Sequence, residues 1–143
     1  MGRLLGIARA PKRRARLIEL EESEIRTAGG IAGDVRGAKS GRQVTVLFRE
    51  GWEAACAELG VRLPWVTRRA NLFIEGIAVP REGGRLIVGE LVLEVTQETQ
   101  PCRVMEAAHR GLRRALTPEW RGGVCCRVIK GGTIRVGDQV DSA

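Results

Sequence analysis

The residue with the clearest chemical potential is Cys102, which follows Pro101 in the stretch EVTQETQPCRVMEAAHRG at residues 94–111. Proline is favoured in the first turn of a helix, so we expect Cys102 to lie in such a turn. Free backbone N–H groups and the positive helix end would favour the thiolate, and Arg103 adds a cation next to it. The sulfur could then act as a nucleophile or a metal ligand, although a first-turn cysteine can equally be structural.

The segment TRRAN at residues 67–71 holds two side chains that suit an anionic ligand. If this segment is extended, Arg69 and Asn71 point to one face and Arg68 points away, because side chains alternate along a strand. A forked cation near an amide suits a phosphate group or the edge of a heterocycle. The same residues could instead form the salt-bridged end of a surface strand, and both interpretations stay open here.

A third segment, GGIAGDVRG at residues 29–37, is rich in glycine and contains Gly33, Asp34 and Arg36. Glycines allow backbone N–H groups to approach an anion closely. The segment has no P-loop lysine, so it can equally be an ordinary turn. We treat it as a candidate anion-binding loop that needs the other two segments to form a site.

The spacing of the cysteines and of the single histidine argues against a zinc site. Cys125 and Cys126 are adjacent, so in a strand they face opposite ways, and the chain has no C-x₂-C spacing. His109 follows Cys102 by two helical turns, which separates the groups by roughly 10 Å, and we expect it at the surface. No zinc and no disulfide framework are expected, which fits a reducing cytoplasm.

Short alternating apolar segments separated by glycines predict a mostly β fold. We expect strands at residues 3–9, 15–20, 42–48, 71–76, 85–89, 91–96, 125–130 and 133–137. So many short strands with few edge-protecting features predict a compact barrel that is closed or nearly closed.

Two helices are expected to interrupt these strands. The first covers residues 50–60 and ends at Gly60, with Cys56 on its apolar face. The second covers about 101–116, and its apolar stripe is formed by Val104, Ala108, Leu112 and Ala115.

The composition places the chain among ordinary globular proteins. Its 143 residues suit one domain spanning 1–143, and 43% of them are hydrophobic and 29% charged. No apolar run approaches the length needed to cross a bilayer, and the first residues lack the features of a signal peptide. We therefore expect a soluble cytoplasmic protein without a membrane partner.

The formal net charge of +7 makes anionic partners plausible. The arginines are dispersed, tyrosine is absent, and only three tryptophans and two phenylalanines could stack on bases, which argues against nucleic acid as the main partner. A denser basic group is formed by Lys12, Arg13, Arg14 and Arg16. It could bind a phosphate, or it could be a solvated loop.

Six motifs in order resemble the MOSC domain, the C-terminal domain of molybdenum-cofactor sulfurases. They are GIAGD (30–34), RQVTV (42–46), RRANLFIEGI (68–77), LIVGELVLEVTQ (86–97), PC (101–102) and RGGVCCRVIKGGTIRVGD (121–138). The resemblance covers nearly the whole chain. It implies a compact Greek-key-like β-barrel, similar to the barrel of pyruvate kinase, with about two short helices.

The resemblance also implies roles for the candidate residues. Cys102 matches the family's cysteine, which carries a persulfide sulfur or coordinates molybdenum. Arg69 and Asn71 match an R-x-N arrangement that holds the pterin and its phosphate. Gly33 and Asp34 match a GD pair, and the later glycine motifs at Gly122, Gly123, Gly137 and Asp138 are interpreted mainly as turns.

Three functions follow as hypotheses. The first is a stand-alone MOSC protein that carries sulfur on Cys102, with a pyridoxal-phosphate-dependent, cysteine-desulfurase-like donor and a metalloenzyme acceptor. The second is a molybdenum-cofactor (molybdopterin) binding module of a reductase of N-hydroxylated compounds, with Cys102 as a metal ligand. The third is an anion-binding or nucleic-acid-binding barrel without catalysis.

The chain departs from its larger relatives in two ways. It is too short to contain the pyridoxal-phosphate domain of the full sulfurases, and it lacks the N-terminal extension of the amidoxime-reducing relatives. We therefore expect it to work alone or with partners. In the larger relatives the missing region makes part of the contacts to the cofactor, and the basic group at residues 12–16 could replace some of them here.

Overall fold

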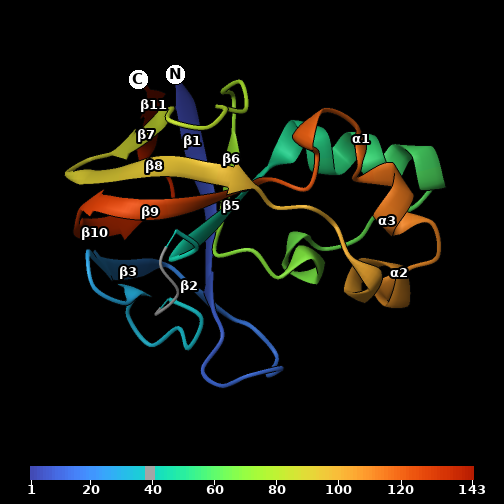
Figure 1. The fold of residues 1–143 in the computed structure, drawn as a ribbon, viewed down its shortest axis with the longest axis horizontal. Coiled ribbons are helices and arrows are strands. Elements are labelled where there is room, and N and C mark those ends of the chain that lie inside the picture. The colour runs from blue at the N-terminus through green and yellow to red at the C-terminus, as the bar shows by residue number, and fades with distance from the viewer. Residues whose placement is uncertain (38–40) are drawn as a thin grey trace.

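The computed structural model of the chain describes residues 1–37 and 41–143 (Figure 1). In that part of the chain the strands are β1 (Gly2–Arg9), β2 (Ile18–Leu20), β3 (Glu22–Arg26), β4 (Gly30–Ile31), β5 (Val44–Phe48), β6 (Leu72–Glu75), β7 (Arg85–Val88), β8 (Leu91–Glu98), β9 (Val124–Lys130), β10 (Gly132–Arg135) and β11 (Gln139–Ser142). The helices are α1 (Arg49–Leu59), α2 (Arg103–Ala108) and α3 (Leu112–Ala115), with 3₁₀ turns η1 (Trp65–Arg68) and η2 (Pro118–Trp120).

Strands of the main sheet close into a barrel. Their order is β11-β7-β8-β9-β5-β6-β1, and β1 pairs with β11 to complete the ring, while β2 extends the sheet beyond β1. The pairing of β5 with β6 is parallel, whereas each of the other pairings described in the ring is antiparallel. The predicted closed, mostly β barrel is therefore confirmed. A second sheet, of order β10-β3-β4, lies beside it.

The barrel interior is apolar because the strands alternate. Val44, Val46 and Phe48 of β5 are buried in one cluster with Leu91 and Leu93 of β8. The period-two pattern that predicted strands at 42–48 and 91–96 places these side chains on one face of each strand.

The helices pack on one side of the barrel and form a second apolar cluster (Figure 1). α1 buries Trp52, Ala55 and Cys56, and Gly60 ends it in the left-handed conformation with φ 67°. Both the first helix and the structural role of Cys56 are therefore as predicted.

The second predicted helix is wrong in its extent. Residues 101–116 form two short helices, and Gly111 breaks them with φ 87°. The buried residues of the helical pair include Met105 and Leu112, whereas Val104 is 50% exposed. The break rotates α3 relative to α2, so a stripe calculated for one continuous helix does not apply.

The predicted strand at 15–20 begins only at Ile18, and residues 11–17 form a loop between β1 and β2. Among the helices described, none is long and apolar enough to cross a membrane.

Candidate functional site

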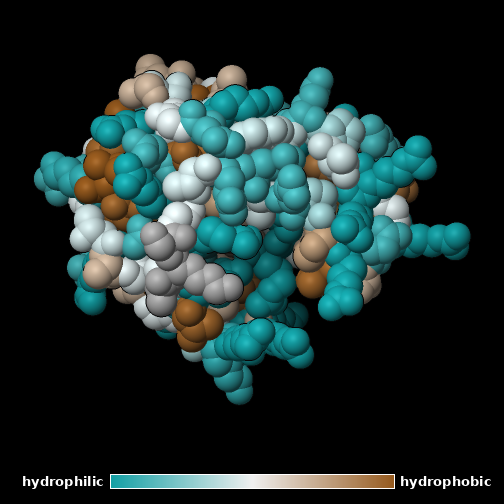
Figure 2. Space-filling model, in the orientation of Figure 1, coloured by the Kyte–Doolittle hydropathy of each residue, from teal (hydrophilic) through white to brown (hydrophobic). Residues whose placement is uncertain are grey.

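A cavity of about 290 Å³ opens between η1, the start of β5 and the segment that leads into α2. It is lined by Arg36, Arg42, Thr45, Arg68, Arg69, Ala70, Asn71, Thr99, Cys102, Val104 and Met105. Figure 2 shows hydrophilic side chains gathered on this face, between the barrel and the helices. The lining therefore combines four arginines with one thiol.

Cys102 presents an exposed thiol to the cavity. Its backbone is extended, with φ −127°, and its carbonyl oxygen accepts the first hydrogen bond of α2 from the N–H of Met105 at 2.9 Å. Cys102 thus precedes the helix, and the prediction of a first-turn position is wrong by one residue. Since α2 has only six residues, we assign its positive end no role at the sulfur.

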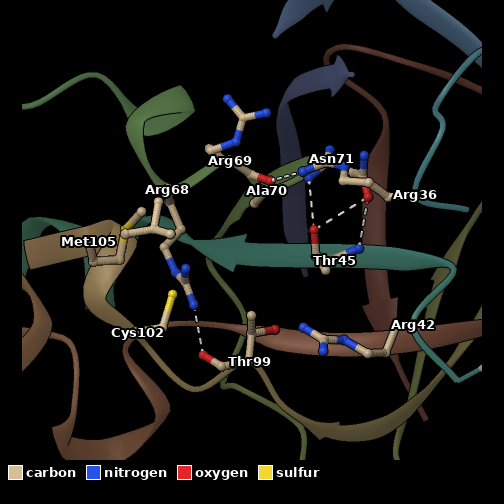
Figure 3. Close-up of a pocket in the computed structure, with 11 residues that line it drawn as sticks. Arg36, Arg42, Thr45, Arg68, Arg69, Ala70, Asn71, Thr99, Cys102 and Met105 are labelled. Carbon is tan, nitrogen blue, oxygen red and sulfur yellow. Dashed lines mark hydrogen bonds between the residues drawn. The ribbon is translucent and has the colours of Figure 1, made fainter. Parts of the chain in front are cut away.

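The cation beside this sulfur is Arg68. Figure 3 shows the Cys102 sulfur pointing toward the Arg68 guanidinium. Arg68 is only 8% exposed, and it donates from Nε to the carbonyl oxygen of Gly122 at 3.0 Å and from Nη2 to that of Thr99 at 2.8 Å. Burial has the largest effect and lowers the pKa of Arg68, while the negative charges that Cys102, Cys125 and Glu98 can carry act in the opposite direction. Arg68 and Cys102 therefore interact electrostatically.

The expectation that Arg68 points away from Arg69 rested on a condition that the structure does not meet, although Figure 3 shows the two guanidinium groups pointing in opposite directions. It assumed an extended chain, whereas residues 65–68 form the 3₁₀ turn η1 and Arg69 follows in the left-handed conformation with φ 64°. This turn brings both arginines to the cavity, together with Asn71.

Gly122 shows how closely the chain packs around Arg68. A Cβ atom at this position would lie 2.6 Å from the carbonyl oxygen of Thr99 and 3.2 Å from Nη2 of Arg68. A glycine is therefore required for the two carbonyl groups to hold the guanidinium. The interpretation of Gly122 as mainly a turn residue misses this contact.

Asp34 lies directly behind the cavity as a buried acceptor. Its carboxylate accepts hydrogen bonds from the backbone N–H groups of Ala10 (3.2 Å) and Arg36 (2.7 Å), from the Arg36 guanidinium (2.9 and 3.2 Å) and from Asn71 Nδ2 (2.6 Å). Burial alone would raise the pKa of Asp34, but the hydrogen bonds and charge of Arg36 outweigh it and lower the pKa. Asp34 is therefore held ionised.

Asn71 is saturated by protein partners. Its Oδ1 accepts from the N–H of Thr45 at 3.0 Å and from the Thr45 hydroxyl at 3.3 Å, and its Nδ2 donates to Ala8 and Asp34. The side chain thus ties β1, β5 and the Asp34 loop together. Its polar atoms are used to position the site.

Arg36 and Arg69 connect this network to the cavity. Arg36 Nη1 donates to the carbonyl oxygen of Arg69 at 2.6 Å, and Arg69 Nη2 donates to that of Ala15 at 2.9 Å. Burial and the nearby Arg36 lower the pKa of Arg69. Gly33 has φ 81° and turns the chain before Asp34, but it does not line the cavity.

The predicted site residues therefore fall into two groups. Cys102, Arg36, Arg69 and Asn71 meet at the cavity, with Asp34 bonded behind them. The sequence analysis did not select Arg68, Arg42 or Thr99 as site residues. Of these three, only Arg68 could have been noticed, because it lies next to the candidate Arg69. Figure 3 shows Arg42 approaching from the side opposite Cys102.

The other cysteines and the histidine lie elsewhere. Cys125 is buried and its sulfur is 3.2 Å from the Thr99 hydroxyl oxygen. Burial, with the neighbouring Cys125, raises the pKa of Cys126. His109 is half-buried, and its Nδ1 lies 3.0 Å from the carbonyl oxygen of Arg110. Within residues 1–37 and 41–143 no group of three or more His, Cys, Asp or Glu side chains could hold a metal ion.

Comparison with known proteins gives the family. The model described as "MOSC domain" matches residues 32–141. The chain belongs to the MOSC domain family. This agrees with the resemblance seen in the sequence motifs. A search of curated proteins gave no match.

Solved structures support the fold of this MOSC domain. The YuaD protein from Bacillus subtilis is similar with a TM-score of 0.81 and 20% identity, covering 99% of this chain and 96% of that chain. YiiM from Geobacillus stearothermophilus gives a TM-score of 0.76 and 17% identity, covering 100% and 75%. YiiM from Escherichia coli gives 0.71 and 18%, covering 99% and 69%. At these identities the similarity concerns the fold.

Proposed function

We propose that this MOSC domain carries sulfur on Cys102 and delivers it to an anionic acceptor of molybdenum-cofactor chemistry. The observation that carries the proposal is the exposed Cys102 thiol beside the buried Arg68, in a cavity lined by four arginines. A cation next to a thiol favours the thiolate, which is the reactive form. The surrounding guanidinium groups suit phosphate.

The transfer requires two exchange steps. The Cys102 thiolate attacks the outer sulfur of a donor persulfide, so that a new S–S bond forms at Cys102 and the donor's S–S bond breaks. The donor leaves as a thiolate and takes a proton from water. In the second step a nucleophilic acceptor attacks the outer sulfur of the Cys102 persulfide, and the Cys102 thiolate leaves.

Arg68 has a specific role in this scheme. It is buried, its two described hydrogen bonds go to neutral carbonyl groups, and among the residues described it forms no ion pair with a carboxylate. Glu98 is near enough to raise the pKa of Arg68, but its carboxylate forms no ion pair with the guanidinium, and a buried cation without a paired anion is costly. A thiolate or persulfide anion at Cys102 would balance this charge. A cysteine-desulfurase-like donor and a metalloenzyme acceptor are the partners that the scheme calls for.

A second function, binding of the molybdenum cofactor with Cys102 as a metal ligand, is favoured by a separate observation. The described residues offer no cluster of protein ligands for a bare metal ion, so a metal at Cys102 would have to arrive with most of its ligands. A pterin dithiolene meets this condition, and the arginine lining fits its phosphate. The bound cofactor would supply oxygen-atom transfer, with Cys102 as ligand and Arg36 and Arg69 near the phosphate.

Mass spectrometry after incubation with polysulfide tests the first function. We expect an adduct of about 32 Da, one sulfur atom, on the wild-type chain, and none on the Cys102→Ser variant. Cys56→Ser is the matched control and should keep the adduct, because Cys56 lies in the helical core. Absence of the adduct from the wild type, or its persistence in Cys102→Ser, would refute sulfur carriage. Bound molybdenum with pterin fluorescence in protein from its native source would favour the second function.

A further inference from the structure

The loop at residues 11–17 carries a group of cations that the proposed function does not use. Lys12, Arg13, Arg14 and Arg16 are all exposed, and no acidic residue lies between Ala10 and Ile18. Within the described residues none of these four forms an ion pair with a carboxylate. Hydrophilic side chains of this loop project from the molecule in Figure 2, below the hollow that contains the cavity.

Both ends of this basic loop are fastened to the cavity wall. At its start, the N–H of Ala10 donates to Asp34 Oδ2 at 3.2 Å, and the carbonyl oxygen of Ala10 accepts from the N–H of Val35 at 3.0 Å. At its end, Arg69 Nη2 donates to the carbonyl oxygen of Ala15 at 2.9 Å. The same Asp34 and Arg69 belong to the candidate site, so these hydrogen bonds join the loop to it.

The loop itself is tightly turned. The N–H of Ala15 donates to the carbonyl oxygen of Lys12 at 3.1 Å, and Arg14 adopts the left-handed conformation with φ 61°. A non-glycine residue in this conformation is uncommon. The turn brings four like charges together in a loop that is hydrogen-bonded to Arg69, and an anion bound there would reduce their mutual repulsion.

We propose that the basic loop is a second anion subsite of the cavity, and that the ligand is an organic diphosphate such as a nucleoside-diphosphate conjugate. The cavity arginines take the inner phosphate, next to Cys102. Arg69 lies between the cavity and the loop, because its guanidinium bonds to Ala15. In this proposal an outer phosphate beyond Arg69 is bound by Lys12, Arg13 and Arg14 of the loop, which do not line the cavity itself. This inference rests on the proposed function, because it specifies the ligand that the Cys102 site serves.

Calorimetric titration of the wild-type chain with phosphate, pyrophosphate and ADP tests the inference. We expect pyrophosphate and ADP to bind at least about tenfold more tightly than phosphate, and to slow alkylation of Cys102 at correspondingly lower concentrations. The triple variant Lys12→Gln, Arg13→Gln, Arg14→Gln should lose this tenfold preference and keep its affinity for phosphate.

The matched control removes the same charge elsewhere. Arg110, Arg113 and Arg114 are exposed on the helical side and do not line the cavity, so their replacement by glutamine should leave all three affinities unchanged. The proposal would be overturned if both triple variants lost equal affinity for pyrophosphate and ADP. It would also be overturned if the wild type bound these two ligands no more tightly than phosphate. It would also fail if a short thymidine oligonucleotide bound more tightly than ADP, because the loop would then be a nucleic-acid surface. The titrations contain no sulfur donor, so their result does not depend on whether Cys102 can be loaded with sulfur. Failure of this inference can therefore be told apart from failure of the proposed function.

Discussion

Replacing Asp34 with alanine is expected to lower the free energy of unfolding by about 3 kcal/mol. The Asp34 carboxylate is buried and accepts five hydrogen bonds from Ala10, Arg36 and Asn71. Without it, the buried donors of Ala10, just after β1, and of Asn71, just before β6, lose their partner, as does the Arg36 side chain. The measurement is urea denaturation at pH 7, followed by circular dichroism.

The stability lost in Asp34→Ala is expected to depend on pH. The folded-state pKa of Asp34 is lowered from 3.8, because the bonds from Arg36 outweigh the effect of burial. The carboxylate therefore contributes its full stability above about pH 4, and this contribution is lost as the pH falls through the folded-state pKa. The difference between wild type and Asp34→Ala should shrink in acid.

Asp138→Ala is the matched control for Asp34→Ala. Asp138 also follows a glycine, but its carboxylate accepts from the Arg135 N–H in an exposed turn at 2.8 Å. We expect Asp138→Ala to lower the free energy of unfolding by about 1 kcal/mol or less. If the two variants lost equal stability, Asp34 would not be the centre of the network.

Replacing Arg68 with methionine should slow alkylation of Cys102 at pH 7 by about tenfold. Methionine keeps much of the buried side-chain volume and removes the guanidinium that Figure 3 shows next to the sulfur. It also leaves the carbonyl groups of Thr99 and Gly122 without a donor, at a cost of about 2 kcal/mol. Iodoacetamide labelling followed by mass spectrometry measures the rate, and circular dichroism checks the fold.

Two further variants separate charge from structure. Arg68→Lys keeps the cation but not both carbonyl contacts, so it should recover part of the rate. Arg103→Met removes the exposed arginine that follows Cys102 in α2, and its rate should stay within about twofold of the wild type. If Arg103→Met lowered the alkylation rate of Cys102 more than Arg68→Met did, Arg103 and not Arg68 would be the cation that activates the thiol.

The barrel could be predicted because its interior strands have a clear apolar period. β5 and β8 show this pattern, and both were expected from Val44, Val46, Leu91 and Leu93. β3 and β11 were missed, since Glu22–Arg26 and Gln139–Ser142 are mostly polar. Their places depend on pairing with distant strands, such as β11 with β1.

The residues of the candidate site could be selected by their types, but the hydrogen bonds among them could not be predicted. Asp34, Arg69, Asn71 and Cys102 were chosen for their chemistry, and the structure places them at or next to one cavity. The left-handed Arg69 could not be anticipated, because this conformation is uncommon outside glycine. Together with the 3₁₀ turn η1, it brings Arg68 and Arg69 to one cavity.

The roles of Asn71 and Asp34 also depend on contacts that only the three-dimensional structure shows. A sequence with R-x-N indicates a ligand contact at Asn71, yet the Asn71 amide bonds to Thr45, Ala8 and Asp34. In the proposed function, contact with the ligand therefore falls to the arginines and to Cys102. This division explains why Asp34→Ala is expected to act on stability and Arg68→Met on reactivity.

Site-resolved alkylation of the native protein tests the central claim most directly. The rate at each cysteine is compared with its rate in the urea-unfolded chain at pH 7. Cys102 should react faster in the folded protein than in the unfolded one, while the buried Cys56, Cys125 and Cys126 are protected. A folded-state rate at Cys102 equal to or below the unfolded rate would contradict the account.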